Sequence, residues 1–193
     1  MVEEERVVIK PGVCKEFLNN FKAVGDGECF MFNDINMSFK KIEQLNKACD
    51  EVKEVETVDL SENNLTDIKS LETFQNLTSI NVSNNKIKGL SMFTVDEAFP
   101  NLKWVNLSNN QLKEMPNMKL PKLEYLDISQ NLIMEKVAEG WTGHPNVRKI
   151  KSVETKFKTF AVFKNCPNLE ELYMAKNQLT TLGGWESLPK LKI

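Results

Sequence analysis

The sequence predicts an α/β solenoid, with a curved parallel sheet on its concave face and short helices and loops on its convex face. Three observations support this prediction. Seven segments share one spacing, with apolar residues at most of positions 1, 4, 6 and 11. Position 9 is asparagine in five of them, and successive segments start 21 to 25 residues apart. The seven segments start at Phe32, Val55, Leu77, Leu102, Leu123, Val147 and Leu169.

The clearest copy spans residues 102–112, with Val105 and Leu107 at positions 4 and 6 and Asn110 at position 9. This spacing at this interval is the signature of the leucine-rich repeat. Positions 3 to 7 read as a short strand, so positions 4 and 6 point inward and positions 3, 5 and 7 point outward. The return segments supply further core residues, such as Leu71, Phe74, Phe93 and Phe99.

An asparagine at position 9 has a structural explanation. Its amide can donate to and accept from the backbone of adjacent coils, which satisfies groups that a tight turn would otherwise leave unpaired. We therefore predict structural roles, not ligand contacts, for Asn63, Asn85, Asn110, Asn131 and Asn177.

Residues 1–28 are expected to form an N-terminal segment, and residues 29–193 the repeat domain. Val13, Phe17, Phe21 and Val24 recur at helical spacing before Gly25-Asp26-Gly27. This pattern predicts an amphipathic helix that caps the first coil. The alternative is that this helix is a partner-binding peptide. A second helix is expected over residues 42–52, in the return segment of the first coil.

At the C-terminus, Leu191-Lys192-Ile193 is the beginning of an eighth copy, and no cap follows it. An open strand edge invites association. We expect that the sequence is a portion of a longer protein or comes from a truncated gene model, or that a partner covers this edge.

The pattern weakens in the copy that starts at Val147. Ser152 stands at position 6 and Thr155 at position 9, and a basic cluster surrounds them. Either this coil is a degenerate one tolerated between better neighbours, or it is a contact patch. The first copy also lacks the asparagine and has Lys40 in its place.

Composition narrows the class of partner. A net charge of −2 and a pI near 5.7 argue against general affinity for nucleic acid or anionic membranes. No apolar run approaches the roughly 18 residues that span a bilayer, and the N-terminus lacks the pattern of a secretion signal. Four cysteines without Cys-x-x-Cys spacing indicate reduced, buried thiols. We therefore expect a cytoplasmic protein.

The sequence shows no sign of catalytic chemistry. Its single histidine, His144, precedes Pro145 in a return loop, where we expect it to be solvated. No metal-ligand spacing, phosphate-binding loop or calcium loop is present, so no metal, cofactor or catalytic residue is predicted.

The outward positions of the strands predict a recognition surface. Trp104 and Tyr125 fall on adjacent strands, and lysines and Tyr173 follow on the next two. Exposed tryptophan and tyrosine are frequent hot spots of protein interfaces. The alternative is cross-strand stacking with no partner. The predicted partner-binding residues are Trp104, Tyr125, Asp127, Lys149, Lys151 and Tyr173.

The copies Val55-Glu-Thr-Val-Asp-Leu-Ser-Glu-Asn-Asn-Leu and Leu169-Glu-Glu-Leu-Tyr-Met-Ala-Lys-Asn-Gln-Leu resemble the intracellular, roughly 22-residue class of leucine-rich repeats. Phosphatase-1 regulators and axonemal proteins share this form. The order Phe21-Lys-Ala-Val-Gly-Asp-Gly, a first coil without asparagine, and then these copies is similar to the family of leucine-rich repeat-containing protein 23, of the radial spokes of motile cilia. That family continues with further repeats and a charged helical tail, which this sequence lacks.

The resemblance implies a non-catalytic scaffold of the ciliary axoneme that takes part in radial spoke assembly, with axonemal proteins as partners. The alternative is a regulatory subunit that binds a protein phosphatase or a dynein motor through its concave face.

Overall fold

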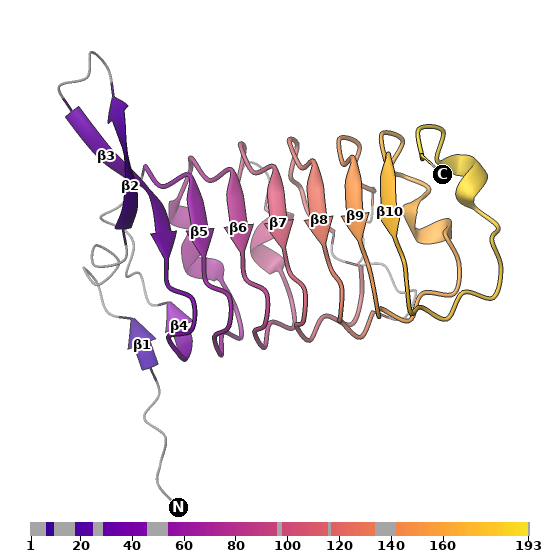
Figure 1. Ribbon diagram of the computed structural model, residues 1–193, viewed down its shortest axis with the longest axis horizontal. Coiled ribbons are helices and arrows are strands. Elements are labelled where there is room, and N and C mark those ends of the chain that lie inside the picture. Colours follow the sequence, from indigo (N-terminus) through magenta and orange to yellow (C-terminus); the bar gives the residue numbers. More distant parts are fainter. Residues whose placement is uncertain are drawn as a thin grey trace, which may run out of the picture.

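A computed structural model describes residues 7–9, 18–24, 29–45, 54–95, 98–115, 117–133 and 142–192 of the chain. Within them lies an eight-stranded sheet, in the order β10-β9-β8-β7-β6-β5-β3-β2, and a two-stranded sheet of β1 and β4. Figure 1 shows β5 to β10 side by side, with their arrows pointing the same way and short helices behind them. The predicted solenoid is thus confirmed.

Each repeat contributes one parallel strand at the same three positions, 3 to 5, of its spacing. The register is unbroken, so that position 3 of each strand pairs with position 3 of the next. The strands are β3 (Cys29–Asn36), β5 (Thr57–Asp59), β6 (Ser79–Asn81), β7 (Trp104–Asn106), β8 (Tyr125–Asp127), β9 (Lys149–Lys151) and β10 (Glu171–Tyr173).

The core follows the inward positions. From Ile35 to Ile150, every residue at position 4 is at most 2% exposed, and position 6 is fully buried from Met37 to Ser152. The predicted return-segment residues, Leu71, Phe74, Phe93 and Phe99, are all buried as well. Three short helices of the 3-10 type carry part of this core: η2 (Lys69–Thr73), η3 (Ser91–Thr94) and η4 (Ala161–Phe163). A fourth, η5 (Trp185–Ser187), has no buried residue.

Position 8 has a left-handed backbone in every copy, which the apolar pattern did not indicate. The φ angles there lie between 51° and 60°, and only two of the seven residues are asparagine. Residues with a Cβ are disfavoured in this region by roughly 1–2 kcal/mol, and asparagine less so. The residues are Phe39, Glu62, Asn84, Asn109, Gln130, Glu154 and Lys176.

We expect Glu62→Asn to raise the free energy of unfolding by about 0.5–1 kcal/mol, because asparagine tolerates the φ of 56° at this exposed position. Urea unfolding measures the change. Glu62→Gln removes the same charge without the conformational advantage, so it should leave stability within about 0.5 kcal/mol. Equal effects of the two variants would show that charge, not backbone conformation, is responsible.

The predicted N-terminal capping helix is wrong over residues 18–24. They form β2 (Leu18–Val24), which pairs antiparallel with β3. At eight residues, β3 is longer than the other strands of the array. Its outer edge would therefore expose a long row of unpaired backbone N–H and C=O groups, and pairing with β2 satisfies them. Residues 13–17 lie outside the described part of the chain.

The helix expected over residues 42–52 is also not found where it can be checked. Ile42–Leu45 form β4, which pairs in parallel with β1 (Val7–Ile9). Backbone pairing with a segment distant in sequence overrides the local helical pattern, and such pairing cannot be read from one window of residues. Residues 46–53 lie outside the described residues.

At the other end, the array continues in register past β10. In successive coils, position 2 donates its N–H to the carbonyl of position 2 in the coil before, as Glu170 does to Arg148 at 2.8 Å. Lys192 donates in the same way to Glu170, at 2.9 Å. Residues 191–192 therefore take the first positions of an eighth coil, as the sequence pattern predicts.

Candidate protein-binding face

The outward strand positions bring the predicted interface residues together on β7 to β10. The register aligns Trp104 with Tyr125, Tyr125 with Lys149, and Lys149 with Glu171. One row over, Asp127 pairs with Lys151, and Lys151 with Tyr173. All six predicted residues therefore lie in one patch four strands wide, which we call the aromatic patch.

Trp104 and Tyr125 stack on each other. Their ring centroids are 5.1 Å apart and their planes differ by 6°. Both side chains are partly exposed, and the neighbour of Trp104 on β6 is the much smaller Ser79. The two rings are therefore stacked at the boundary between the larger side chains of β7 and β8 and the small side chain of Ser79 on β6.

Lysines extend the patch towards the C-terminal end. The Lys151 Nζ lies 5.8 Å from the centroid of the Tyr125 ring, and the Lys149 Nζ lies 5.0 Å from that of Tyr173. Lys149 also forms a 2.7 Å ion pair with Glu171, which lowers the pKa of that carboxyl. Both cations thus lie within the distance at which cation–π attraction operates.

Asp127 is the buried member of the aromatic patch. It is 8% exposed, and its Oδ1 accepts the backbone N–H of Ser129 at 2.9 Å. Its Oδ2 faces the Tyr125 hydroxyl at 3.4 Å. Burial, and then the nearby Asp127 carboxylate, raise the pKa of Tyr125 to about 12.

This pKa predicts an alkaline transition. Because the folded-state value lies above the ordinary value of 10.0, Tyr125 contributes stability that is fully present below pH 10 and is lost as the pH rises towards 12. The chain has only two tyrosines, so phenolate absorbance can follow each of them. We expect one transition near pH 12 that disappears in Tyr125→Phe. A Tyr125 transition near pH 10 in the folded protein would contradict this assignment.

Sequence reasoning missed the function of positions 5 and 7 in the first five coils. The side-chain oxygen at position 5 accepts the backbone N–H two residues later, as Asp59 does from Ser61 at 2.9 Å and Asn36 does from Ser38 at 3.0 Å. In these local turns the side-chain oxygen at position 5 is hydrogen-bonded within its own coil, on that half of the face. The recurrence of Asn or Asp two residues before Ser was the available signal.

The copy that starts at Val147 keeps its coil despite its departures. Ser152 and Thr155 are both fully buried. Asn177 of the next coil accepts the Thr155 hydroxyl at 2.9 Å and the N–H of Phe157 at 2.9 Å. The departures at these two positions therefore lie inside the solenoid, and they do not contribute surface to a contact patch.

His144 is buried, not solvated as expected, with an exposed fraction of 2%. The adjacent Gly143 explains the close packing. Its φ is +82°, and a Cβ there would come within 2.0 Å of the Asn165 carbonyl oxygen. The loop thus lies against the next coil. Cys166 is a buried free thiol, as predicted, and burial raises its pKa.

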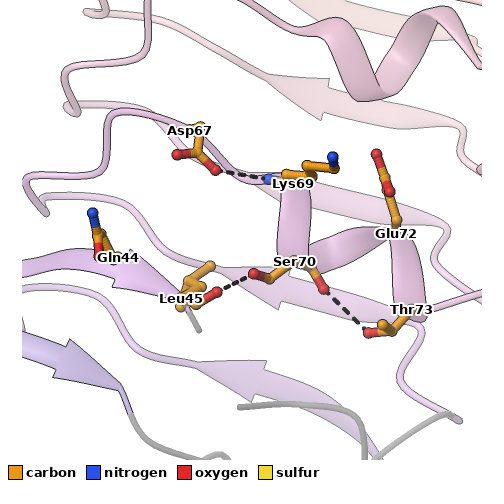
Figure 2. Close-up of a pocket in the computed structure, with 7 residues that line it drawn as sticks. All are labelled: Gln44, Leu45, Asp67, Lys69, Ser70, Glu72 and Thr73. Carbon is orange, nitrogen blue, oxygen red and sulfur yellow. Dashed lines mark hydrogen bonds between the residues drawn. The ribbon is translucent and has the colours of Figure 1, made fainter. Parts of the chain in front are cut away.

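The described residues also form hollows away from the aromatic patch, two of which differ in the residues that line them. The first, of about 400 Å³, lies between β4 and η2 (Figure 2). Its hydroxyls are engaged with nearby backbone: Ser70 donates to the Leu45 carbonyl, and Thr73 donates to the Ser70 carbonyl at 3.1 Å. The second, of about 390 Å³, is apolar and is lined by Phe160, Leu182, Trp185, Leu191 and Lys192.

In the described part of the chain, no three His, Cys, Asp or Glu side chains are placed to hold a metal ion. Over those same residues, no helix has the length and apolar character needed to cross a membrane.

The stacked parallel coils and the position-9 asparagines define a repeat solenoid with a broad outer surface. Family comparisons agree. A leucine rich repeat family matches residues 75–133, a two-copy form matches residues 53–94, and a further leucine rich repeat family matches residues 165–184. The chain is a leucine-rich repeat protein. Domains of this kind generally mediate protein–protein interactions and are typically non-catalytic.

Solved structures show the same fold. The chain is similar to the functional domain of InlJ from Listeria monocytogenes, with a TM-score of 0.65, 18% identity, and coverage of 83% of this chain and 33% of that one. For an internalin (InlF) of the same organism the TM-score is 0.68 and the identity 19%, over 83% and 46% of the two chains.

The leucine-rich repeat domain of APL1B gives a TM-score of 0.63 with 20% identity, over 82% of this chain and 52% of that one. The chain thus spans between a third and about half of these three proteins. Identities this low establish the fold alone. No curated protein matches the sequence.

Proposed function

We propose that this chain is a non-catalytic scaffold that binds another protein through the aromatic patch, and that residues 29–193 are the domain that does so. The observation that carries the proposal is the Trp104–Tyr125 stack, with its centroids 5.1 Å apart on a partly exposed sheet face. A rigid aromatic pair loses little conformational entropy on binding, which makes it a suitable anchor.

The part of the patch on β9 and β10 also differs chemically from the rest of the same face. The strands of the first five coils, β3 and β5 to β8, use Asn or Asp at position 5 in local turns, whereas β9 and β10 have Lys151 and Tyr173 there. Lys151 and Tyr173 are free of that local turn motif, and Tyr173 is 45% exposed. Side chains not used in local turns are available to a partner.

We further propose that the chain is a cytoplasmic protein of the ciliary axoneme, that its partner is another axonemal component, and that it takes part in radial spoke assembly. The support is the resemblance of its first coil and its repeats to the radial-spoke family of leucine-rich repeat-containing protein 23. Localisation of a tagged chain in a ciliated cell tests this part. Diffuse cytosolic signal without ciliary signal would refute it and leave the protein-binding proposal standing.

A double variant, Trp104→Ala/Tyr125→Ala, tests the binding face. We expect affinity for the partner to fall by at least about 2 kcal/mol, roughly thirtyfold, because the two anchors are removed together. The readout is binding of purified chain to spoke proteins isolated from axonemes. The matched control is Lys103→Ala, because Lys103 is exposed and directly precedes β7 but lies outside the aromatic patch. Unchanged binding by a folded double variant would refute the proposed face.

The same binding assay, with the purified chain and the double variant, distinguishes the alternative partners. Capture of a phosphatase catalytic subunit or a dynein motor domain, lost in the double variant and with no spoke protein present, would replace the axonemal scaffold with a regulatory subunit. Capture through a surface that the double variant does not affect would exclude both versions of the concave-face proposal.

A further inference from the structure

A row of lysines lies along the edge of the solenoid at which the parallel strands end. Positions 10 to 12 of each coil run past this edge, and adjacent coils hydrogen-bond there. Lys86 donates its N–H to the Leu65 carbonyl at 2.8 Å, and Thr180 donates to the Lys158 carbonyl at 3.0 Å. Position 11 is buried in the first six coils, as at Leu65 and Phe157, so positions 10 and 12 on either side of it face outward there.

Five lysines occupy these outward positions on β6, β7 and β9 coils, and all five are exposed. Leu132, on the β8 coil between them, is 53% exposed. Coils stack roughly 4.8 Å apart, so the group extends over about 14 Å. We call it the lysine strip: Lys86, Lys88, Lys113, Leu132, Lys156 and Lys158.

Among the described residues, acidic side chains are scarce at the outward positions of this edge. Across positions 10 and 12 of the described residues, the only acid is Glu43, on the first coil. Within the described part of the chain, Lys86, Lys88, Lys113 and Lys156 form no ion pair. Like charges on neighbouring coils repel each other. The strip therefore raises the energy of the free protein in a way that an anionic partner would relieve.

The opposite edge shows the usual arrangement. There, position 2 alternates in sign along Lys103, Glu124, Arg148, Glu170 and Lys192. Ion pairs join these residues, including Lys103 with Glu124 at 3.8 Å and Arg148 with Glu170 at 3.4 Å. Because the chain as a whole has a net charge of −2, the strip is a local concentration of positive charge.

We propose that the lysine strip docks an acidic, extended protein segment that places an apolar residue against Leu132. Charge complementarity selects the acidic segment, and the exposed leucine among the lysines favours a peptide over a nucleic acid, which offers no aliphatic side chain to it. The surface is separate from the aromatic patch, so it would serve a second contact of the scaffold.

The probe is a dye-labelled peptide of ten residues, glutamate throughout except for one central leucine, in fluorescence anisotropy at low salt. We expect binding that weakens as salt rises, and that falls at least about tenfold in Lys86→Glu/Lys113→Glu/Lys156→Glu. The matched control, Lys103→Glu/Lys122→Glu/Lys190→Glu, reverses three charges on the opposite edge and should retain the affinity. Equal losses in both variants would mean that only net charge matters, and would overturn the proposal.

Leu132→Ser tests the apolar contact. It should weaken binding of the leucine-containing peptide at least about threefold and leave an all-glutamate peptide unaffected. Trp104→Ala/Tyr125→Ala should change neither result, which keeps this test independent of the proposed function. Single-stranded RNA or anionic phosphatidylserine vesicles that bind as tightly as the peptide, with the same dependence on the strip, would show a general polyanion site and refute the proposal.

Discussion

Asn131→Ala will lower the free energy of unfolding by about 3–4 kcal/mol, the largest effect expected of any polar substitution in the array. Asn131 is 1% exposed. Its Nδ2 donates to the Leu107 carbonyl at 2.9 Å and to the Ile128 carbonyl at 3.0 Å, and its Oδ1 accepts the N–H of Leu112 at 3.0 Å. Alanine leaves these buried groups unpaired, and each unpaired group costs about 1–3 kcal/mol.

Urea unfolding followed by circular dichroism measures this loss. Asn177→Ala removes the same kind of amide from a partly exposed coil, where water can replace it, so we expect about half the effect. Asn76→Ala, which removes an amide that donates to the exposed Glu54 carboxylate, should stay within about 0.5 kcal/mol of the natural protein. A loss below 1 kcal/mol for Asn131→Ala would show that the asparagine ladder is dispensable.

Phe93→Ala will destabilise the protein by about 3–5 kcal/mol, because it opens a cavity behind the sheet. Phe93 lies in η3, is fully buried, and meets Phe99 edge to face, with centroids 5.2 Å apart. Contacts in a solenoid are made only with neighbouring coils, so no distant part of the chain can collapse into the space.

Phe93→Leu keeps most of the volume and should cost about 1–1.5 kcal/mol. Val95→Ala, two residues along and 54% exposed, is the control, with an expected change within about 0.5 kcal/mol. Thermal or urea unfolding gives all three values. Equal losses for Phe93→Ala and Phe93→Leu would mean that ring contacts, and not cavity volume, dominate.

The aromatic patch was partly accessible from sequence. The repeat fixes which residues share a row, so Trp104, Tyr125 and Lys149 could be placed as neighbours before any coordinates. The stacking angle of 6° and the pairing of Lys149 with Glu171 could not. Both depend on side-chain torsions and on competition among several neighbours, which spacing does not specify. Nor could spacing show that Asp127 is 8% exposed and that its Oδ2 lies 3.4 Å from the Tyr125 hydroxyl.

The two helix predictions failed for a common reason. Residues 18–24 and 42–45 carry apolar patterns compatible with a helix, but both segments find a strand partner: β3 for the first and β1 for the second. His144 was misjudged for a related reason, since the close approach of Gly143 to Asn165 buries the loop. In each case a contact distant in sequence decides the outcome.

The sequence alone determined the solenoid, its number of coils between Phe32 and Leu169, and the inward and outward residues of each strand. It did so because each repeat specifies its own coil within about 22 residues, and successive coils of the same shape stack on one another. The tertiary structure decided which segments the first coil pairs with, which polar residues of the face form local turns, and how lysines of different coils gather along one edge. Those outcomes depend on neighbours contributed by other coils, whose side chains meet only when the chain is wound.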